Sequence, residues 1–94
     1  MLDFETAKKM VEEEINRSFN ADDDELVVVE EETVQKEYGW IFFYTSRRFL
    51  ETGDLNFMVA GNAPVVVNKR TGKLTFLGTA EPLENYLRRY EQSQ

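Results

Sequence analysis

The stretch Trp40-Ile41-Phe42-Phe43-Tyr44-Thr45 is the strongest strand signal in this 94-residue chain. Aromatic and β-branched side chains favour a pleated strand, and both alternating faces of the stretch are apolar until its end. A strand with two apolar faces lies in the centre of a sheet, where both sides are covered. The sequence therefore predicts a central strand over residues 40–45, with Phe49 and Leu50 as an extension. Trp40 is expected to fill the core rather than bind a ligand.

Shorter strand signals flank this stretch. Residues 26–29 are aliphatic and begin a strand that is expected to continue through residues 30–33, followed by a turn over residues 35–39. Residues 64–68 and 73–77 form a hairpin pattern around a polar loop. Consecutive strands joined by short turns predict a four-stranded, mainly antiparallel sheet.

Helical periodicity marks both ends of the chain. Apolar residues recur at steps of three and four over residues 3–18 and again over residues 83–90, so an amphipathic helix is predicted in each place. Asp3 and Thr79 are the expected N-caps of these helices. A third, short helix is expected near residues 55–60, because a glycine stands just past its end.

Together these elements predict a single α+β domain over residues 1–94. It is expected to be a two-layer sandwich, in which the N-terminal and C-terminal helices cover one face of the sheet. The chain is 41% hydrophobic and 13% aromatic, which is enough apolar material for one core. A core of this size leaves few large side chains to spare for function.

The absence of cysteine and histidine excludes several chemistries. Thiolate metal sites and Ser–His or Cys–His nucleophiles cannot be built from this chain, and a cysteine-free sequence fits a reducing compartment. The N-terminal segment has no basic or apolar leader, and the longest apolar runs hold about five residues where a membrane span needs about 20. We therefore expect a soluble, cytoplasmic protein that is not an enzyme and holds no cofactor. A calcium or magnesium site built from carboxylates alone stays open on these grounds.

The net charge of −7 limits the partners of this protein. An acidic surface repels DNA, RNA and anionic membranes, and it attracts a basic protein. The same charge also serves solubility alone. Composition leaves both interpretations open.

Ten of the eighteen acidic residues stand in three runs, Glu12-Glu13-Glu14, Asp22-Asp23-Asp24-Glu25 and Glu30-Glu31-Glu32. Neighbouring residues of a helix or strand point in different directions, so these runs do not converge into a metal site or a catalytic carboxylate pair. One interpretation is a solvated face. The other is an acidic ridge that docks a basic protein. Its binding residues would be Asp22, Asp23, Asp24 and Glu31, with Tyr38 as an aromatic anchor beside them.

The second half of the chain carries a resemblance to a known family. The motifs, in chain order, are the aromatic strand preceded by Gly39, the run Phe49-Leu50-Glu51-Thr52-Gly53-Asp54, the run Ala60-Gly61-Asn62-Ala63-Pro64, the turn Thr71-Gly72, Leu77-Gly78-Thr79-Ala80 and Pro82-Leu83-Glu84-Asn85-Tyr86-Leu87. Each motif is common by itself. Their order and spacing over roughly residues 38–91 resemble the YrhB-like family, also described as immunity protein 35 of bacterial polymorphic toxin systems.

This resemblance implies a non-catalytic protein that binds and neutralises a toxin made by the same or a neighbouring cell. One branch of the family is described as chaperone-like. The alternative function is therefore a protein that binds unfolded clients and suppresses their aggregation. Such a protein needs a sizeable exposed apolar patch. Most apolar residues of this chain fit the predicted core faces, with Phe57 as the chief exception.

We expect the residues of these motifs to have structural roles rather than to bind a partner. Gly53, Gly61 and Gly72 are expected to supply backbone conformations that side chains forbid. Asn62 is expected to hydrogen-bond the backbone of its own irregular segment. Pro64 is expected to start a strand that is accessible at the edge of the sheet.

Overall fold

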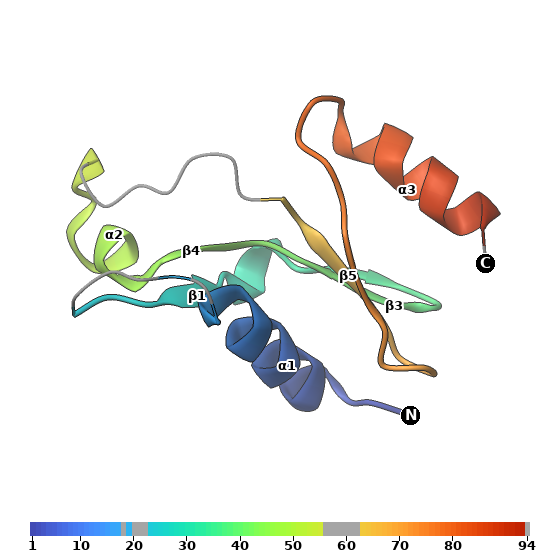
Figure 1. The fold of residues 1–94 in the computed structure, drawn as a ribbon, viewed down its shortest axis with the longest axis horizontal. Helices are drawn as coiled ribbons and strands as arrows, with labels where there is room; N and C mark the ends of the chain where they lie inside the picture. Colours follow the sequence, from blue (N-terminus) through green and yellow to red (C-terminus); the bar gives the residue numbers. More distant parts are fainter. Residues whose placement is uncertain (18, 20–22, 56–62, 94) are drawn as a thin grey trace.

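The computed structural model describes residues 1–17, 19, 23–55 and 63–93. Its elements, in chain order, are α1 (Phe4–Asn16), β1 (Leu26–Val28), the 3-10 turn η1 (Glu30–Glu32), β2 (Val34–Lys36), β3 (Gly39–Phe42), β4 (Tyr44–Ser46), α2 (Arg47–Thr52), β5 (Val65–Asn68), β6 (Leu74–Phe76) and α3 (Leu83–Gln92). Two antiparallel sheets result (Figure 1): a larger one in the order β2-β3-β5-β6 and a smaller one made of β1 and β4. The predicted α+β class with a four-stranded antiparallel sheet is confirmed.

The aromatic stretch is divided between these two sheets. β3 pairs with β2 and β5 in the larger sheet, and all four of its residues are buried. At Phe43 the chain changes partners, because the carbonyl oxygen of Phe43 already accepts a hydrogen bond from the N–H of Val29 at 2.8 Å. β4 then pairs with β1. The prediction of a single strand over residues 40–45 was therefore wrong, because β3 ends at Phe42 and β4 begins at Tyr44.

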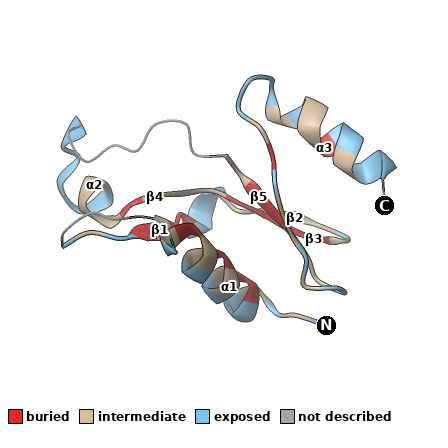
Figure 2. Cartoon of the chain, in the orientation of Figure 1, coloured by how far each residue is buried: buried red, intermediate tan, exposed pale blue. Residues whose placement is uncertain are grey.

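Alternate residues of β3 face opposite sides of the larger sheet. Trp40 and Phe42 pack with Ala7, Val11 and Ile15 of α1, and Trp40 is only 8% exposed. Ile41 packs on the other side, with the apolar residues of α3. Figure 2 shows the buried residues gathered in the strands between the two helices.

The larger sheet is thus covered by α1 on one face and by α3 on the other. The expected two-layer arrangement, with both helices on one face, was wrong. The helices lie on opposite faces because β3 and β5 are apolar on both faces. Each face of the sheet therefore has to be shielded from water by a helix.

Two further segments on the N-terminal side of β3 differ from expectation. Residues 30–33 do not extend β1 but turn at η1, where the N–H of Glu32 donates to the carbonyl of Val29 at 3.1 Å. This turn leaves three consecutive carboxylates in water. Residues 35–39 are only partly a turn, because β2 pairs with β3. As an edge strand, β2 tolerates the polar side chains that concealed it in the sequence.

The residues after β4 form a helix rather than a strand extension. Ser46 is the N-cap of α2, and its Oγ accepts a hydrogen bond from the N–H of Phe49 at 3.2 Å. Gly53 ends α2 in the left-handed region at a φ of 69°, as a C-terminal glycine does. Apart from Leu55, the short helix expected near residues 55–60 lies outside the described residues, as do Phe57, Gly61 and Asn62.

The two ends of the chain follow their predicted periodicity. Asp3 caps α1 as expected, since its Oδ1 accepts from the N–H of Thr6 at 2.8 Å. Pro82, not Thr79, stands at the N-cap of α3. Its fixed φ suits the start of a helix.

The hairpin of β5 and β6 is confirmed, and Gly72 has the predicted positive φ of 74°. Pro64 precedes β5, which lies between β3 and β6, so the expectation of an edge strand was wrong. The missing N–H of Pro64 costs no pairing because the proline stands before the strand. Its carbonyl still accepts from the N–H of Leu77 at 2.8 Å.

Candidate functional site

The acidic turn before β1 is bonded to the start of α2. Asp24 accepts hydrogen bonds through Oδ1 from the N–H groups of Glu25 at 2.7 Å and Arg48 at 3.1 Å. Its Oδ2 accepts from the hydroxyl of Ser46, which is fully buried. Arg47 adds two bonds, from its N–H to the carbonyl of Glu25 and from its guanidinium to the carbonyl of Asp23. Turn and helix therefore form one unit.

These bonds govern the charge of Asp24. Partial burial opposes the ionised form and would raise its pKa. The hydrogen bonds from Ser46, Arg48 and Glu25 outweigh burial, and Arg47 adds a favourable charge, so that the pKa of the Asp24 carboxyl lies below its ordinary value. Asp24 is ionised at neutral pH, but its oxygens are committed to the backbone and to Ser46.

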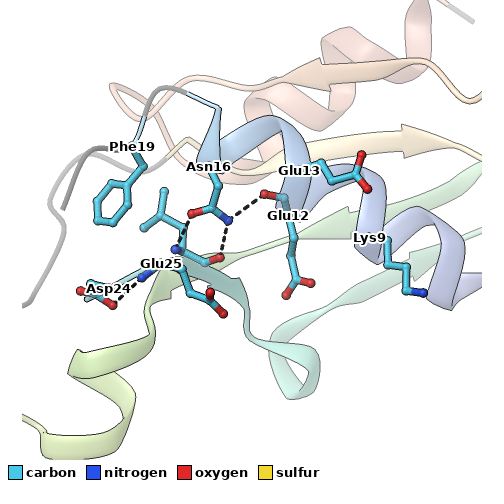
Figure 3. A pocket seen from close by; sticks show the side chains of 8 residues that line it. Lys9, Glu12, Glu13, Asn16, Phe19, Asp24 and Glu25 are labelled. Carbon is cyan, nitrogen blue, oxygen red and sulfur yellow. Dashed lines mark hydrogen bonds between the residues drawn. The ribbon is translucent and has the colours of Figure 1, made fainter. Parts of the chain in front are cut away.

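A groove of about 670 Å³ lies between α1 and the start of β1 (Figure 3). We call it the acidic groove, because four carboxylates and one lysine line it. The lining residues are Lys9, Glu12, Glu13, Asn16, Phe19, Asp24, Glu25 and Leu26. The acidic runs of α1 and of the turn before β1 thus meet in one place, although Glu13 and Asp24 are eleven positions apart in the sequence.

Two of these polar side chains hold the groove together. Asn16 bonds both backbone groups of Leu26, accepting from its N–H and donating to its carbonyl, each at 2.8 Å. Glu12 accepts from the N–H of Val28 at 3.0 Å. Sequence reasoning missed both roles. The available signal was a polar pair spaced four residues apart beside the apolar face of α1. Glu13 and Glu25 are exposed and remain available to a partner.

The acidic surface continues along α1 toward η1. Lys8 forms an ion pair with Glu30 at 2.8 Å, and this hydrogen-bonded carboxylate raises the pKa of the lysine. Asn16 contacts the start of β1 and Lys8 contacts the turn after it, so α1 runs antiparallel to β1. Glu31 is exposed in η1. Of the residues predicted to form the acidic ridge, Asp23 and Asp24 stand before β1 and Glu31 stands after it. Asp22 lies outside the described residues.

Tyr38 lies on the other side of the larger sheet. Its hydroxyl donates to a carboxylate oxygen of Glu91 at 2.7 Å, and its ring centroid lies 5.3 Å from that of Tyr90. Burial, followed by the neighbouring Glu91 carboxylate, raises the pKa of Tyr38 above its ordinary range. The structure places Tyr38 against α3 and does not bring it to the acidic groove, which is built on α1.

The described part of the chain contains neither a metal-binding cluster of side chains nor a membrane-spanning helix. No group of three or more acidic side chains in residues 1–17, 19, 23–55 and 63–93 is placed to hold a metal ion. None of the helices in this part of the chain is long and apolar enough to cross a bilayer.

Comparison with known proteins bears on the family of this chain. The family described as immunity protein 35 matches residues 5–92. A curated relative, the uncharacterized protein YrhB of Escherichia coli (strain K12), is 53% identical over 53 residues. The aligned part covers 56% of this chain and 56% of the relative, so the match spans about half the length of each. No solved structure matches the chain. Because the family match extends over nearly all of the sequence, the chain belongs to the immunity protein 35 family.

Proposed function

We propose that this protein neutralises a toxin domain with a basic surface by binding it at the acidic groove. Membership of an immunity protein family supports toxin binding as the general role. The observation that carries the specific proposal is the lining of the groove, which includes four carboxylates and a single lysine. Two of these acids, Glu13 and Glu25, are exposed.

The expected effect of this surface is on the rate of association. Complementary charge steers two proteins together and speeds association by roughly 10- to 1000-fold at low ionic strength. Dissolved salt screens the attraction over about 10 Å, so the gain is largest in dilute buffer. The proposed partner is therefore a basic toxin domain.

A non-catalytic mechanism fits the same residues. Glu12 and Asp24 accept hydrogen bonds from backbone N–H groups, so both carboxylates have a structural role. The chain also has no histidine or cysteine to act as base or nucleophile. Neutralisation would follow from occupying the toxin's surface.

The alternative, a chaperone-like protein, depends on exposed apolar surface. In the described part of the chain four large apolar side chains are exposed, Met1, Leu50, Leu55 and Phe76. They belong to three separate parts of the fold: the chain start, the residues of and after α2, and β6. Suppression of the aggregation of a heated, unrelated enzyme at near-stoichiometric ratio would favour this alternative over toxin binding.

The proposal is tested with the toxin domain encoded by the reading frame next to the gene for this chain. The variant carries Glu13→Gln and Glu25→Gln, which remove charge without altering the bonds of Glu12 or Asp24. The control carries Glu37→Gln and Glu84→Gln, two exposed acids in the β2–β3 turn and on α3. The on-rate is measured at low and at physiological salt.

We expect the groove variant to associate more slowly at low salt, with the difference shrinking at higher salt, while the control matches the unchanged protein. An equal on-rate for the groove variant, with an intact fold, would move the binding surface elsewhere. Failure of the unchanged protein to bind or inactivate this toxin domain would reject the proposed function itself.

A further inference from the structure

Residues 50–55 expose apolar side chains that neither core uses. Leu50 of α2 is 51% exposed and Leu55 is 73% exposed. Neither leucine belongs to the two clusters of buried residues that hold the sheet between α1 and α3. Single exposed apolar residues are common, but two leucines within six residues of one short segment are a local concentration. Apolar anchors of this kind supply most of the affinity in protein interfaces.

Acidic residues lie in the same segment as these leucines and in the turn that is bonded to the start of α2. Glu51 and Asp54 are exposed in the same segment. Asp23 and Glu25 are exposed in the turn that is bonded to the start of α2. The guanidinium of Arg47 lies against this turn, because it donates a hydrogen bond to the carbonyl of Asp23 at 2.9 Å. The basic residues of α2 are Arg47 and Arg48, so acidic side chains outnumber basic ones in this segment and its turn.

Both ends of α2 are held by hydrogen bonds. At its start Ser46 bonds the N–H of Phe49, and Asp24 bonds the N–H of Arg48. At its end the N–H of Gly53 donates to the carbonyl of Phe49 at 2.8 Å. A segment already held in one conformation loses little entropy on binding, so its exposed side chains contribute more of their contact energy to affinity.

We propose that Leu50 and Leu55 are the apolar anchors that enter a hydrophobic pocket on the toxin domain, with Glu51, Asp54 and the turn at Asp23 pairing with basic residues around that pocket. This inference rests on the proposed function. Charge selects the partner: a second copy of this acidic chain would place like charges together, whereas a basic protein meets both the apolar and the acidic part of the surface. Asp24 acts as a positioning residue that holds this surface in shape.

The same adjacent-gene toxin domain serves as the probe. The anchor variants are Leu50→Ala and Leu55→Ala. Phe76→Ala is the matched control, because Phe76 is exposed to a similar extent, 47%, but lies on β6. Leu50→Met retains apolar contact and serves as a conservative replacement. Glu51→Lys reverses one charge at an exposed position without changing an anchor. Thermal unfolding and circular dichroism confirm that each variant is folded.

Each anchor variant is expected to raise the Kd by about tenfold, chiefly through faster dissociation. Phe76→Ala and Leu50→Met should leave the Kd unchanged, and Glu51→Lys should slow association at low salt. Unchanged binding by both anchor variants, while the unchanged protein still inactivates the toxin, would overturn this inference and leave the proposed function standing. No binding by the unchanged protein would overturn the proposed function first.

Discussion

The side chain of Asn16 bonds both backbone groups of Leu26, as a neighbouring strand would do. The side-chain amide of Asn16 accepts from the N–H of Leu26 and donates to its carbonyl, each at 2.8 Å. Leu26 lies in β1, which pairs with β4 on one edge only. The amide, together with Glu12 on Val28, occupies backbone groups on the other edge. A two-stranded sheet is marginal by itself, and here α1 stabilises it by covering that edge.

Replacing Asn16 with alanine should expose this dependence. The variant loses the partners of the Leu26 N–H and carbonyl, so we expect the free energy of unfolding to fall by about 1–3 kcal/mol. Urea denaturation followed by circular dichroism measures the change. Glu13→Ala, at an exposed position on the same helix, is the control and should have little effect. Equal stability of the two variants would show that water replaces the amide without cost.

The charge of Asp24 should make stability depend on pH. Its pKa in the folded protein lies below the ordinary value of 3.8, so the ionised carboxyl stabilises the fold fully above that value. The stabilisation is lost as the pH falls through the lower, folded-state pKa. Asp24→Asn should therefore be less stable than the unchanged protein at pH 7, and the difference should shrink below about pH 4.

Denaturant midpoints at a series of pH values measure this difference. Asp23→Asn is the control, because Asp23 is exposed and the left-handed φ of 60° at this position also suits asparagine. A difference between Asp24→Asn and the unchanged protein that stays constant down to the acid range would contradict a role for the charge.

Tyr38 should behave as an attachment point for α3. Tyr38→Phe removes the hydrogen bond to Glu91 and keeps the ring contact with Tyr90, so we expect a loss of roughly 1 kcal/mol in the free energy of unfolding. Glu91→Gln combined with Tyr38→Phe in a double-mutant cycle isolates this pair. Binding of the adjacent-gene toxin domain should not change. If a folded Tyr38→Phe protein bound the toxin domain more weakly, Tyr38 would instead belong to the binding surface.

Two glycines should respond differently to alanine. A Cβ at Gly39, where φ is 152°, would collide with the carbonyl oxygen of Val67 on the paired strand. Gly39→Ala should therefore cost about 3 kcal/mol or more. Gly53 has a φ of 69° but open space around its Cα, so Gly53→Ala should cost only the backbone strain of about 1–2 kcal/mol. Thermal unfolding compares the two, and equal losses would contradict the steric argument.

Features that depend on neighbours in the sequence were predicted well. The apolar spacing of α1, the cap at Asp3 and the helical face of α3 all follow from contacts within about one turn. The hairpin likewise follows from Gly72 in its loop. The concentration of acidic residues near α1 and β1 was also visible in the sequence, because three runs of consecutive acidic residues stand there.

Features that depend on distant partners were not predicted. The aromatic stretch breaks at Phe43 because Val29 takes its carbonyl oxygen. α2 begins at Arg47 with help from Asp24, whose carboxylate bonds a backbone N–H group 24 residues away. Sequence periodicity reports only local spacing, so it contains no signal for bonds of this range.

The same distinction applies to the candidate binding surface. The sequence by itself determined the fold class, the two long helices and an excess of carboxylates within one third of the chain. Only the tertiary structure decided which carboxylates hold the fold, such as Glu12 and Asp24, and which stay exposed, such as Glu13 and Glu25. It also placed Tyr38 against α3, away from the acidic groove. The physical reason is that a carboxylate or hydroxyl is committed when the chain brings a backbone or side-chain group within hydrogen-bonding distance, and packing determines which groups meet.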